Sequence, residues 1–238
     1  MSALLARAED LYERVRTCDL CPLARTRTLS VPGEGPLTAE VMCIGEAPGA
    51  NEDKQGRPFV GNAGQFLEEL LAAGGLTRPE VYIANVLKCR PPSNRDPAPG
   101  EIQACADYLG EQIALVDPLV VVTLGRFSMA PYFPGQTISR IHGQYKIIAG
   151  RYVVPMYHPA AALHQASLRD VLKDDFRKLP RILDLARASR APRMTPEAVV
   201  ATAPNSQPAA PGPSPAARSP EAFPSISRTE PQQTRLFE

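Results

Sequence analysis

The chain has 238 residues, with 26 lysines and arginines against 25 aspartates and glutamates, a formal net charge of +1. This balance excludes nucleic-acid binding through overall basic charge, so any such contact must come from a local patch and from backbone amides. The sequence lacks an apolar run of about 18 residues or more and a signal-peptide pattern, and we expect a cytoplasmic protein.

The first predicted element is a helix over residues 3–16, where apolar side chains recur at helical spacing. A Cys-x-x-Cys pair, Cys18 and Cys21, follows directly. In a cytoplasmic chain, five cysteines indicate metal binding or chemistry rather than disulfides. By itself the pair is compatible with a redox site, half of a zinc site or half of an iron–sulfur site.

An apolar strand over residues 41–44 leads into a loop rich in glycine and proline, residues 45–64, and a helix over 65–71 leads out of it. Loops that leave the carboxyl ends of strands are where ligands bind in open α/β sheets. Phe59 stands in this otherwise polar loop, which suits the wall of a pocket for a flat ligand or, equally, a plug of the core. Cys43 alternates with apolar neighbours and is expected to be a small core residue.

A second strand over residues 81–85 ends at Asn85, which by itself could be a cap for the following turn. The segment 90–100 is too rich in proline for a helix or a central strand. Basic side chains lie near its ends and form either a patch suited to phosphate contact or a solvated cluster. They are Lys88, Arg90 and Arg95.

Two further cysteines could complete the Cys-x-x-Cys pair. Cys89 precedes the proline-rich loop, and Cys105 lies in a helix predicted over residues 101–109. Neither has a Cys or His partner at the spacing of a zinc knuckle. An iron–sulfur cluster therefore fits at least as well as zinc, and unligated cysteines remain a third possibility.

A continuous β-branched run over residues 119–125 predicts a strand buried on both faces. Residues 138–144 and 145–148 predict a turn followed by an edge strand. His142, in the turn, is expected to be a surface residue. These elements extend the alternation of strands and helices toward the C-terminus.

The last strand, over residues 152–157, ends immediately before His158, and a helix over about 168–188 closes the domain. The alternation predicts a three-layer αβα sandwich around a central, mainly parallel four-stranded sheet. By itself, a lone histidine is slightly more readily structural than catalytic. The glycine-rich loop, Asn85 and His158 all follow strands, however, which favours one functional face.

Residues 189–238 are rich in proline, alanine and serine and contain few large apolar groups. Such a segment cannot bury enough surface to offset its ordering entropy. We therefore predict a domain over residues 1–188 and a disordered tail over 189–238. Near its end the tail carries Gln233, Leu236 and Phe237.

Three motifs and the cysteines closely resemble family-4 uracil-DNA glycosylases, the iron–sulfur type. The motifs are GEAPGANEDKQGRPFVGNAG at 45–64, NVLKCRPPSNRDP at 85–97 and YHPAA at 157–161. The resemblance covers roughly residues 10–185. It implies hydrolysis of the N-glycosidic bond of uracil in DNA, which leaves an abasic site for base-excision repair. It also implies a [4Fe–4S] cluster bound by Cys18, Cys21, Cys89 and Cys105.

The resemblance further implies a role for each pocket residue. Phe59 stacks on uracil, and Asn85 hydrogen-bonds the base edge and selects uracil over cytosine. His158 donates to the uracil oxygen where negative charge develops, and backbone amides of residues 46–49 complete the pocket. The implied uracil-binding set is Glu46, Ala47, Gly49, Phe59, Asn85 and His158.

The sequence departs from the best-known uracil glycosylases at two of these positions. Gly49 stands where they carry a bulky tyrosine that excludes thymine, and Ala47 replaces their water-activating aspartate. Orientation of the water then falls to Glu46 or Asp53, and we favour Glu46. Leu163 is predicted as a wedge that fills the gap left by a flipped base, although a core position would suit it equally.

The tail ending resembles the Gln-x-x-Leu-Phe peptide by which bacterial repair proteins dock on the sliding clamp, a short pattern that also arises by chance. This likeness suggests a bacterial source. Two other functions compete with the glycosylase: a non-catalytic nucleic-acid-binding module, and an electron-transfer or cluster-sensing protein. The presence of Phe59, Asn85 and His158 argues against both. We expect a monomer.

Overall fold

The computed structural model describes residues 2–190 of the chain. These residues form one compact unit. Gln233, Leu236 and Phe237 of the predicted clamp motif lie outside the described residues, as does nearly all of the predicted tail. Within the described part, no helix has the length and apolar character needed to cross a membrane.

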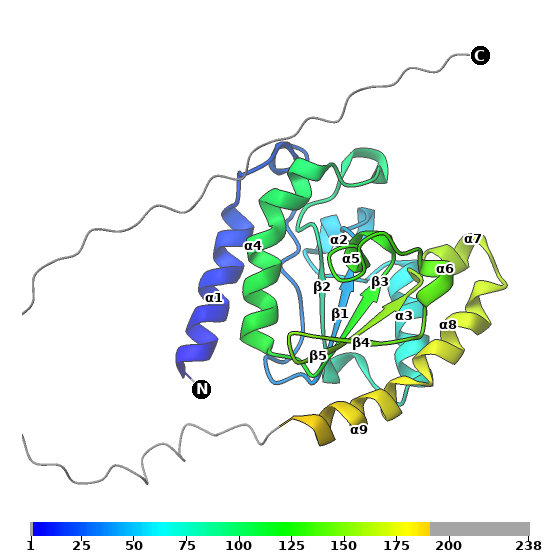
Figure 1. The fold of residues 1–238 in the computed structure, drawn as a ribbon. Coiled ribbons are helices and arrows are strands. Elements are labelled where there is room, and N and C mark those ends of the chain that lie inside the picture. The colour runs from blue at the N-terminus through cyan, green and yellow to red at the C-terminus, as the bar shows by residue number, and fades with distance from the viewer. Residues whose placement is uncertain (1, 191–238) are drawn as a thin grey trace, which may run out of the picture. The chain divides into compact units, whose positions relative to one another are not determined.

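Five strands form a single sheet in the order β2-β1-β3-β5-β4 (Figure 1). Their bounds are β1 (Val41–Gly45), β2 (Val81–Asn85), β3 (Val120–Leu124), β4 (Lys146–Ile148) and β5 (Arg151–Met156). Four strands are parallel, and β4 is antiparallel to β5. The predicted count of four strands is one too low, because the short run expected at the edge pairs fully into the sheet as β4.

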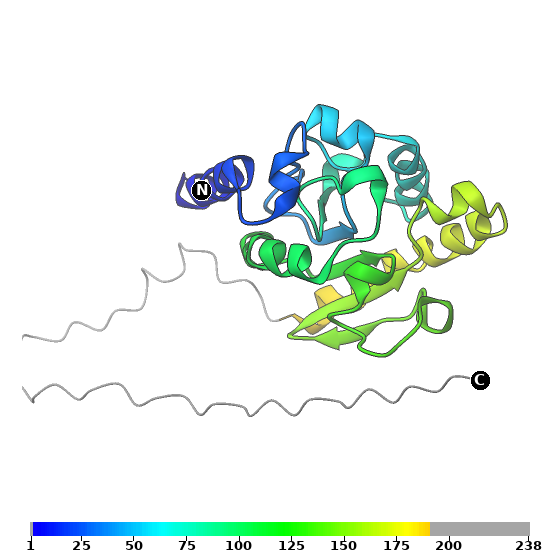
Figure 2. The ribbon, with the colours of Figure 1, turned by 90° about the horizontal axis from the view of Figure 1, so that it is seen from above.

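Helices cover both faces of the sheet and give the predicted three layers (Figures 1 and 2). Their bounds are α1 (Ser2–Thr17), α2 (Ala50–Gln55), α3 (Asn62–Ala73), α4 (Pro99–Val116), α5 (Arg126–Met129), α6 (Ile138–Ile141), α7 (Ala161–His164), α8 (Leu168–Phe176) and α9 (Leu179–Ser189). Helices α3, α8 and α9 pack on one face. Helices α4, α5 and α6 pack on the other, and α1 lies against the outer side of α4.

The alternation of side chains along each strand divides the core into two halves. On β1, Cys43 faces the layer of α3 and α8, whereas Met42 and Ile44 face the layer of α4. All five residues of β1 are buried, as are all those of β2 and β3. This burial explains why these strands have continuous apolar runs in the sequence.

The predicted single helix over residues 168–188 is wrong, because the chain forms two helices there. Helix α8 ends at Phe176 and α9 begins at Leu179, with Pro180 in its first turn. Proline has no backbone N–H and clashes with the preceding turn, so it can start a helix but not continue one. The turn predicted over residues 138–144 also differs, since it opens with the short helix α6, which ends next to His142.

The strand order places a ligand crevice at the carboxyl end of the sheet. The chain passes from β1 to β2 on one side and then returns to β3 on the other side of β1. The loops after β1 and β3 therefore separate above the sheet, and ligands bind at such a switch point. Asn85 ends β2, and His158 follows β5 at the same edge.

Candidate active site

Phe59 is fixed as a wall of this crevice by an unusual backbone conformation. Its φ is +51°, a left-handed value that costs free energy for a residue with a side chain. Arg78 stabilises the turn by donating from Nη1 to the Phe59 carbonyl at 2.9 Å and from Nη2 to the Pro58 carbonyl at 2.6 Å. A Cβ on Gly64 would lie 1.9 Å from the Phe59 carbonyl oxygen, so residue 64 must be glycine.

Asn85 lies beside Phe59 with an unsatisfied polar group. The side chain is 2% exposed, and its Oδ1 has no hydrogen-bond partner within residues 2–190. Its register partner on β1 is Gly45, where a Cβ would stand 2.3 Å from Asn85 Oδ1 and 2.7 Å from the Phe59 ring. Because buried polar groups are normally paired, this atom is positioned to meet a ligand.

His158 completes the group from the loop after β5. Its ring lies 5.6 Å from the Phe59 ring, inclined by 25°. The backbone N–H of Ala160 donates to Nδ1 at 3.1 Å, which makes Nδ1 the acceptor and places the proton of the neutral ring on Nε2. Burial lowers the pKa of His158 to about 4, and Glu52 opposes this shift. The ring is therefore a neutral donor at physiological pH.

These side chains enclose a cavity of about 150 Å³. It is lined by Ala47, Gly49, Glu52, Phe59, Ala63, Asn85, His158 and Ala160. A second cavity of about 310 Å³ adjoins it through shared residues and is lined by Glu46, Ala47, Pro48, Gly49, Pro91, Asn94, Arg95, His158 and Ala160. The smaller cavity suits a flat ring, and the larger one suits the groups attached to that ring.

The two candidate carboxylates for orienting water are separated by their surroundings. Glu46 lines the larger cavity. Its pKa is raised, first by burial and then by the charge of Asp96, whereas Arg126 opposes the rise. Asp53 is buried, and its Oδ1 accepts the backbone N–H of Thr28 at 2.9 Å. Asp53 thus anchors the chain at Thr28 and, unlike Glu46, lines neither cavity.

Glu52 organises the glycine-rich loop, a role that the sequence analysis missed. Its carboxylate accepts backbone N–H groups from Gly49 at 3.1 Å and from Val60 and Gly61 at 2.9 Å each. Both sides of the loop are thereby joined around Phe59. The available sequence signal was the acidic residue three positions after Gly49, the spacing with which a side chain reaches back to the start of a helix.

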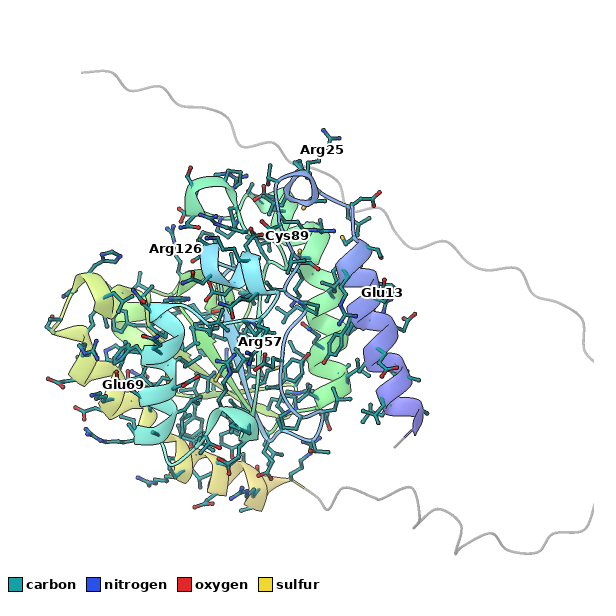
Figure 3. The ribbon with its side chains drawn as sticks, turned by 180° about the vertical axis from the view of Figure 1, so that it is seen from behind. Glu13, Arg25, Arg57, Glu69, Cys89 and Arg126 are labelled. Atoms are coloured by element: carbon teal, nitrogen blue, oxygen red, sulfur yellow. The ribbon has the colours of Figure 1, made fainter. Side chains whose placement is uncertain are left out.

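Three of the four cysteines predicted as ligands lie together near the cavities, and Cys18 packs against the hydrophobic cluster between α1 and α4. Cys89 and Cys105 are buried, Cys18 and Cys21 are partly exposed, and all are free thiols. Leu23 and Leu87 pack with Cys89 and Cys105, and Cys21 lies against this group. Figure 3 shows Cys89 and Arg126 at the same end of the domain, the end toward which the parallel strands run.

Four cysteine thiols match the ligand set of a [4Fe–4S] cluster. Among residues 2–190, no three His, Cys, Asp or Glu side chains converge closely enough for one metal ion. In a [4Fe–4S] cluster each iron takes its own cysteine, so the four thiols need not meet at one point. Arg27 Nη1 donates to Cys89 Sγ at 3.1 Å, and such N–H···S contacts are common around clusters.

Comparison with known proteins identifies the family of this chain. The family profile described as Uracil DNA glycosylase superfamily matches residues 32–181. A Type-4 uracil-DNA glycosylase of Sulfurisphaera tokodaii is 46% identical over 183 residues, which cover 72% of this chain and 82% of that protein. One of Archaeoglobus fulgidus is 46% identical, covering 72% and 90%, and one of Thermotoga maritima is 43% identical, covering 71% and 91%.

The chain belongs to the uracil-DNA glycosylase superfamily. Its relatives named Type-4 match most of their own length. Within this glycosylase fold, the structure brings five of the six predicted uracil-binding residues to the smaller cavity, and Glu46 lines the larger one. The members of the smaller cavity are Ala47, Gly49, Phe59, Asn85 and His158.

The prediction that Lys88 of this glycosylase contacts DNA is wrong. Its side chain is 1% exposed, and Nζ donates to the Asn85 carbonyl oxygen at 2.7 Å and to Gln112 Oε1 at 2.6 Å. Burial lowers the pKa of Lys88 to about 7, while Cys105 and Cys89 favour the charged form. A basic residue at the start of a proline-rich loop predicted an exposed side chain, but helix α4 packs over Lys88.

The other predicted contact residues remain at the surface of the glycosylase. Arg90 donates to Asn94 Oδ1 at 2.8 Å, and the half-exposed Arg95 lines the larger cavity and pairs with Glu101. Leu163 on α7 is 44% exposed, which excludes a core position. Arg126, which the sequence analysis did not single out, has a side chain that is 64% exposed where α5 begins.

Proposed function

We propose that this protein is a uracil-DNA glycosylase that hydrolyses the N-glycosidic bond of uracil in DNA and leaves an abasic site for base-excision repair. The observation that supports this most is the unpartnered, buried Oδ1 of Asn85 in a cavity shared with Phe59 and neutral His158. The relatives named Type-4 uracil-DNA glycosylase support the same reaction.

In the proposed reaction, the target nucleotide leaves the duplex stack and its base enters the smaller cavity. The ring of Phe59 stacks against the base. Asn85 Oδ1 accepts the N3–H of uracil, and its Nδ2 donates to O4. Cytosine presents a lone pair at N3 and an amino group at C4, so the same amide would face two mismatched partners.

His158 acts on the leaving group. As the bond to the sugar breaks, negative charge grows on uracil and positive charge on the sugar. The Nε2–H of His158 donates to the uracil oxygen O2 as that charge develops, and a donor fixed in a buried site costs no reorganisation. Because the pKa is about 4, the ring acts as a neutral hydrogen-bond donor.

Glu46 acts on the other side of the bond. Ala47 has no carboxylate to orient the attacking water, so the carboxylate of Glu46 in the adjoining cavity does so instead. It also stabilises the positive charge on the sugar. Gly49 leaves the rim of the smaller cavity open, so exclusion of thymine rests on the remaining walls.

The DNA backbone lies along the open side of the larger cavity. Arg90, Arg95 and Arg126 contact phosphates there, with Arg126 in the place that the sequence analysis gave to Lys88. Leu163, half-exposed on α7, enters the stack where the flipped base has left. These three arginines would thus bind the DNA backbone without an overall basic charge on the protein.

Cys18, Cys21, Cys89 and Cys105 would hold a [4Fe–4S] cluster. Bound there, the cluster supplies covalent cross-links among the segment after α1, the loop after β2 and helix α4. The residues of the cavities carry out the base excision. We assign the cluster a structural role, because the proposed hydrolysis transfers no electrons.

We further propose that the protein acts as a monomer in the cytoplasm and docks on a bacterial sliding clamp. The docking residues would be Gln233, Leu236 and Phe237, with the preceding residues supplying reach. A peptide of residues 228–238 should bind a purified bacterial clamp, and the double variant Leu236→Ala/Phe237→Ala should not. Absence of peptide binding, with unchanged binding of the full-length double variant, would reject the proposal.

The function is tested with a labelled oligonucleotide that holds a single uracil, followed by alkaline cleavage. Wild-type protein should cut at the uracil and leave a matched cytosine oligonucleotide intact. His158→Ala should lose on the order of 100-fold in rate, and Asn85→Ala at least about tenfold, at unchanged unfolding temperature. Absence of cleavage by an iron-loaded wild-type preparation would overturn the proposal.

A further inference from the structure

Both carbonyls of the strained turn at Phe59 are bound by one guanidinium, that of Arg78. Its Nη1 donates to the Phe59 carbonyl oxygen at 2.9 Å, and its Nη2 donates to the Pro58 carbonyl oxygen at 2.6 Å. A planar guanidinium presents its donors as a rigid fork, which can bind two neighbouring oxygens at once. Phe59 has a φ of +51°, a conformation that persists only where the surroundings fix it. The fork of Arg78 thus acts where the loop needs support.

The orientation of Arg78 is set by Glu34, which is itself joined to strand β2. Arg78 Nε donates to Glu34 Oε1 at 3.1 Å. The backbone of Glu34 forms an antiparallel bridge to Ile83, with N···O distances of 2.9 and 2.7 Å. Ile83 lies two residues before Asn85 on the same strand. These contacts therefore connect the strand that presents Asn85 to the turn that presents Phe59.

The geometry of the Arg78 side chain matters more than its charge. The side chain is 16% exposed, and Nη1 also lies 3.5 Å from Glu68 Oε1. A lysine at this position would keep a positive charge beside the two carboxylates of Glu34 and Glu68. It would lose the planar fork, however, and a compact ammonium cannot reproduce the paired contact with two carbonyls.

We propose that Arg78 is a positioning residue that holds the ring of Phe59 in place to stack on the base in the uracil cavity. Without its fork, the strained turn relaxes and the ring leaves the cavity wall. This inference rests on the proposed function and deepens it, because it identifies what fixes the stacking ring relative to Asn85. Arg78 lines neither cavity, so it acts through Phe59.

A second arginine on the same carboxylate provides a matched control. Arg57 donates from Nε to Glu34 Oε2 at 2.6 Å and from Nη2 to Glu34 Oε1 at 2.8 Å. Its side chain is 55% exposed. Arg57 thus pairs with Glu34 as Arg78 does, but these bonds do not reach the carbonyls of the turn.

The kinetic test compares Arg78→Lys and Arg78→Gln with Arg57→Gln in iron-loaded full-length protein. Both Arg78 variants should lower the single-turnover rate of uracil excision by about tenfold or more, because a displaced positioning group is costly. Their affinity for DNA that holds an abasic-site analogue should be unchanged. Arg57→Gln should stay within about twofold of the wild-type rate, since exposed ion pairs contribute little. Wild-type excision by either Arg78 variant would overturn the proposal.

A fluorescence test follows the ring without relying on excision. The chain contains no tryptophan, so Phe59→Trp places a single fluorophore at a position that is 5% exposed. Adding Arg78→Gln should shift the emission to longer wavelength as the ring becomes solvated, whereas adding Arg57→Gln should not. An unchanged emission with Arg78→Gln would overturn the proposal. An inactive wild type would instead reject the proposed function.

A double-mutant cycle separates positioning of Phe59 from a general loss of structure. If Arg78 acts through Phe59, adding Arg78→Gln to Phe59→Ala should lower excision by no more than about twofold further. An equal loss in the wild-type and Phe59→Ala backgrounds would overturn the proposal. If Arg78→Gln fails to fold, Arg78→Lys replaces it in the cycle and in the fluorescence test, because it keeps the positive charge.

Discussion

Replacing Gly45 by alanine tests whether the uracil cavity depends on the absence of a side chain at the end of β1. The added Cβ would lie 2.3 Å from Asn85 Oδ1 and 2.7 Å from the Phe59 ring, whereas ordinary contact begins at 3.4 Å. The Asn85 side chain must therefore retreat by about 1 Å, and the ring by slightly less. Both groups would leave the positions from which they are proposed to bind uracil.

The expected effect on excision follows from that displacement. A shift of about 1 Å in a positioning group costs on the order of 100-fold in rate, or about 2.7 kcal/mol of transition-state stabilisation. Overpacking at a buried strand position costs about 1–3 kcal/mol of folding free energy. Activity should therefore fall strongly while the variant still folds.

The assay is the single-turnover excision rate of Gly45→Ala, measured with its iron content and its thermal unfolding. Gly110→Ala is the matched control, because its Cβ would have no neighbour within 4 Å on the exposed side of α4. It should keep the wild-type rate and gain about 0.5–1 kcal/mol of stability. Wild-type excision by a folded Gly45→Ala would refute the assigned geometry of the cavity.

Three further predictions concern pH, loop order and iron. Excision should fall toward acid pH, because the carboxylate of Glu46, whose pKa is raised by burial, becomes protonated. The excision rate of Glu46→Gln should fall only near pH 4, where His158 titrates, and by a smaller factor. An acid profile of Glu46→Gln identical to that of the wild type would contradict this. Glu52→Gln should lower the unfolding free energy by about 1–3 kcal/mol and slow excision, because a neutral amide cannot satisfy three backbone N–H groups; identical urea unfolding curves would disprove it. Cys105→Ala should lose iron, whereas Cys43→Ala, altered in the core of the sheet, should keep it; colorimetric iron analysis showing equal iron would count against the assigned ligands.

The order of the elements was predictable because local chemistry sets it. Strand β2 was predicted with the bounds observed, β1 is one residue longer than predicted, and β3 is one residue shorter than predicted at each end. The break between α8 and α9 was also readable in principle from Pro180. The fifth strand was undercounted, because β4 has only three residues and depends on pairing with β5.

The site residues that belong to a sequence motif could be predicted. Those whose role depends on burial could not. Phe59, Asn85 and His158 meet as the strand ends indicated. Lys88 is buried because Gln112, 24 residues further along the chain, brings a carbonyl acceptor to it when α4 packs. Local sequence cannot show that contact.

By itself, the sequence determined the strand–loop–helix units, the family and the positions of the pocket residues, because these depend on local patterns and short motifs. The tertiary structure alone determined which groups lack partners and which are covered. The unpaired Oδ1 of Asn85, the neutral ring of His158 and the covered side chain of Lys88 all arise from burial. Burial depends on elements that are distant in sequence and come together only when the sheet and its helices pack.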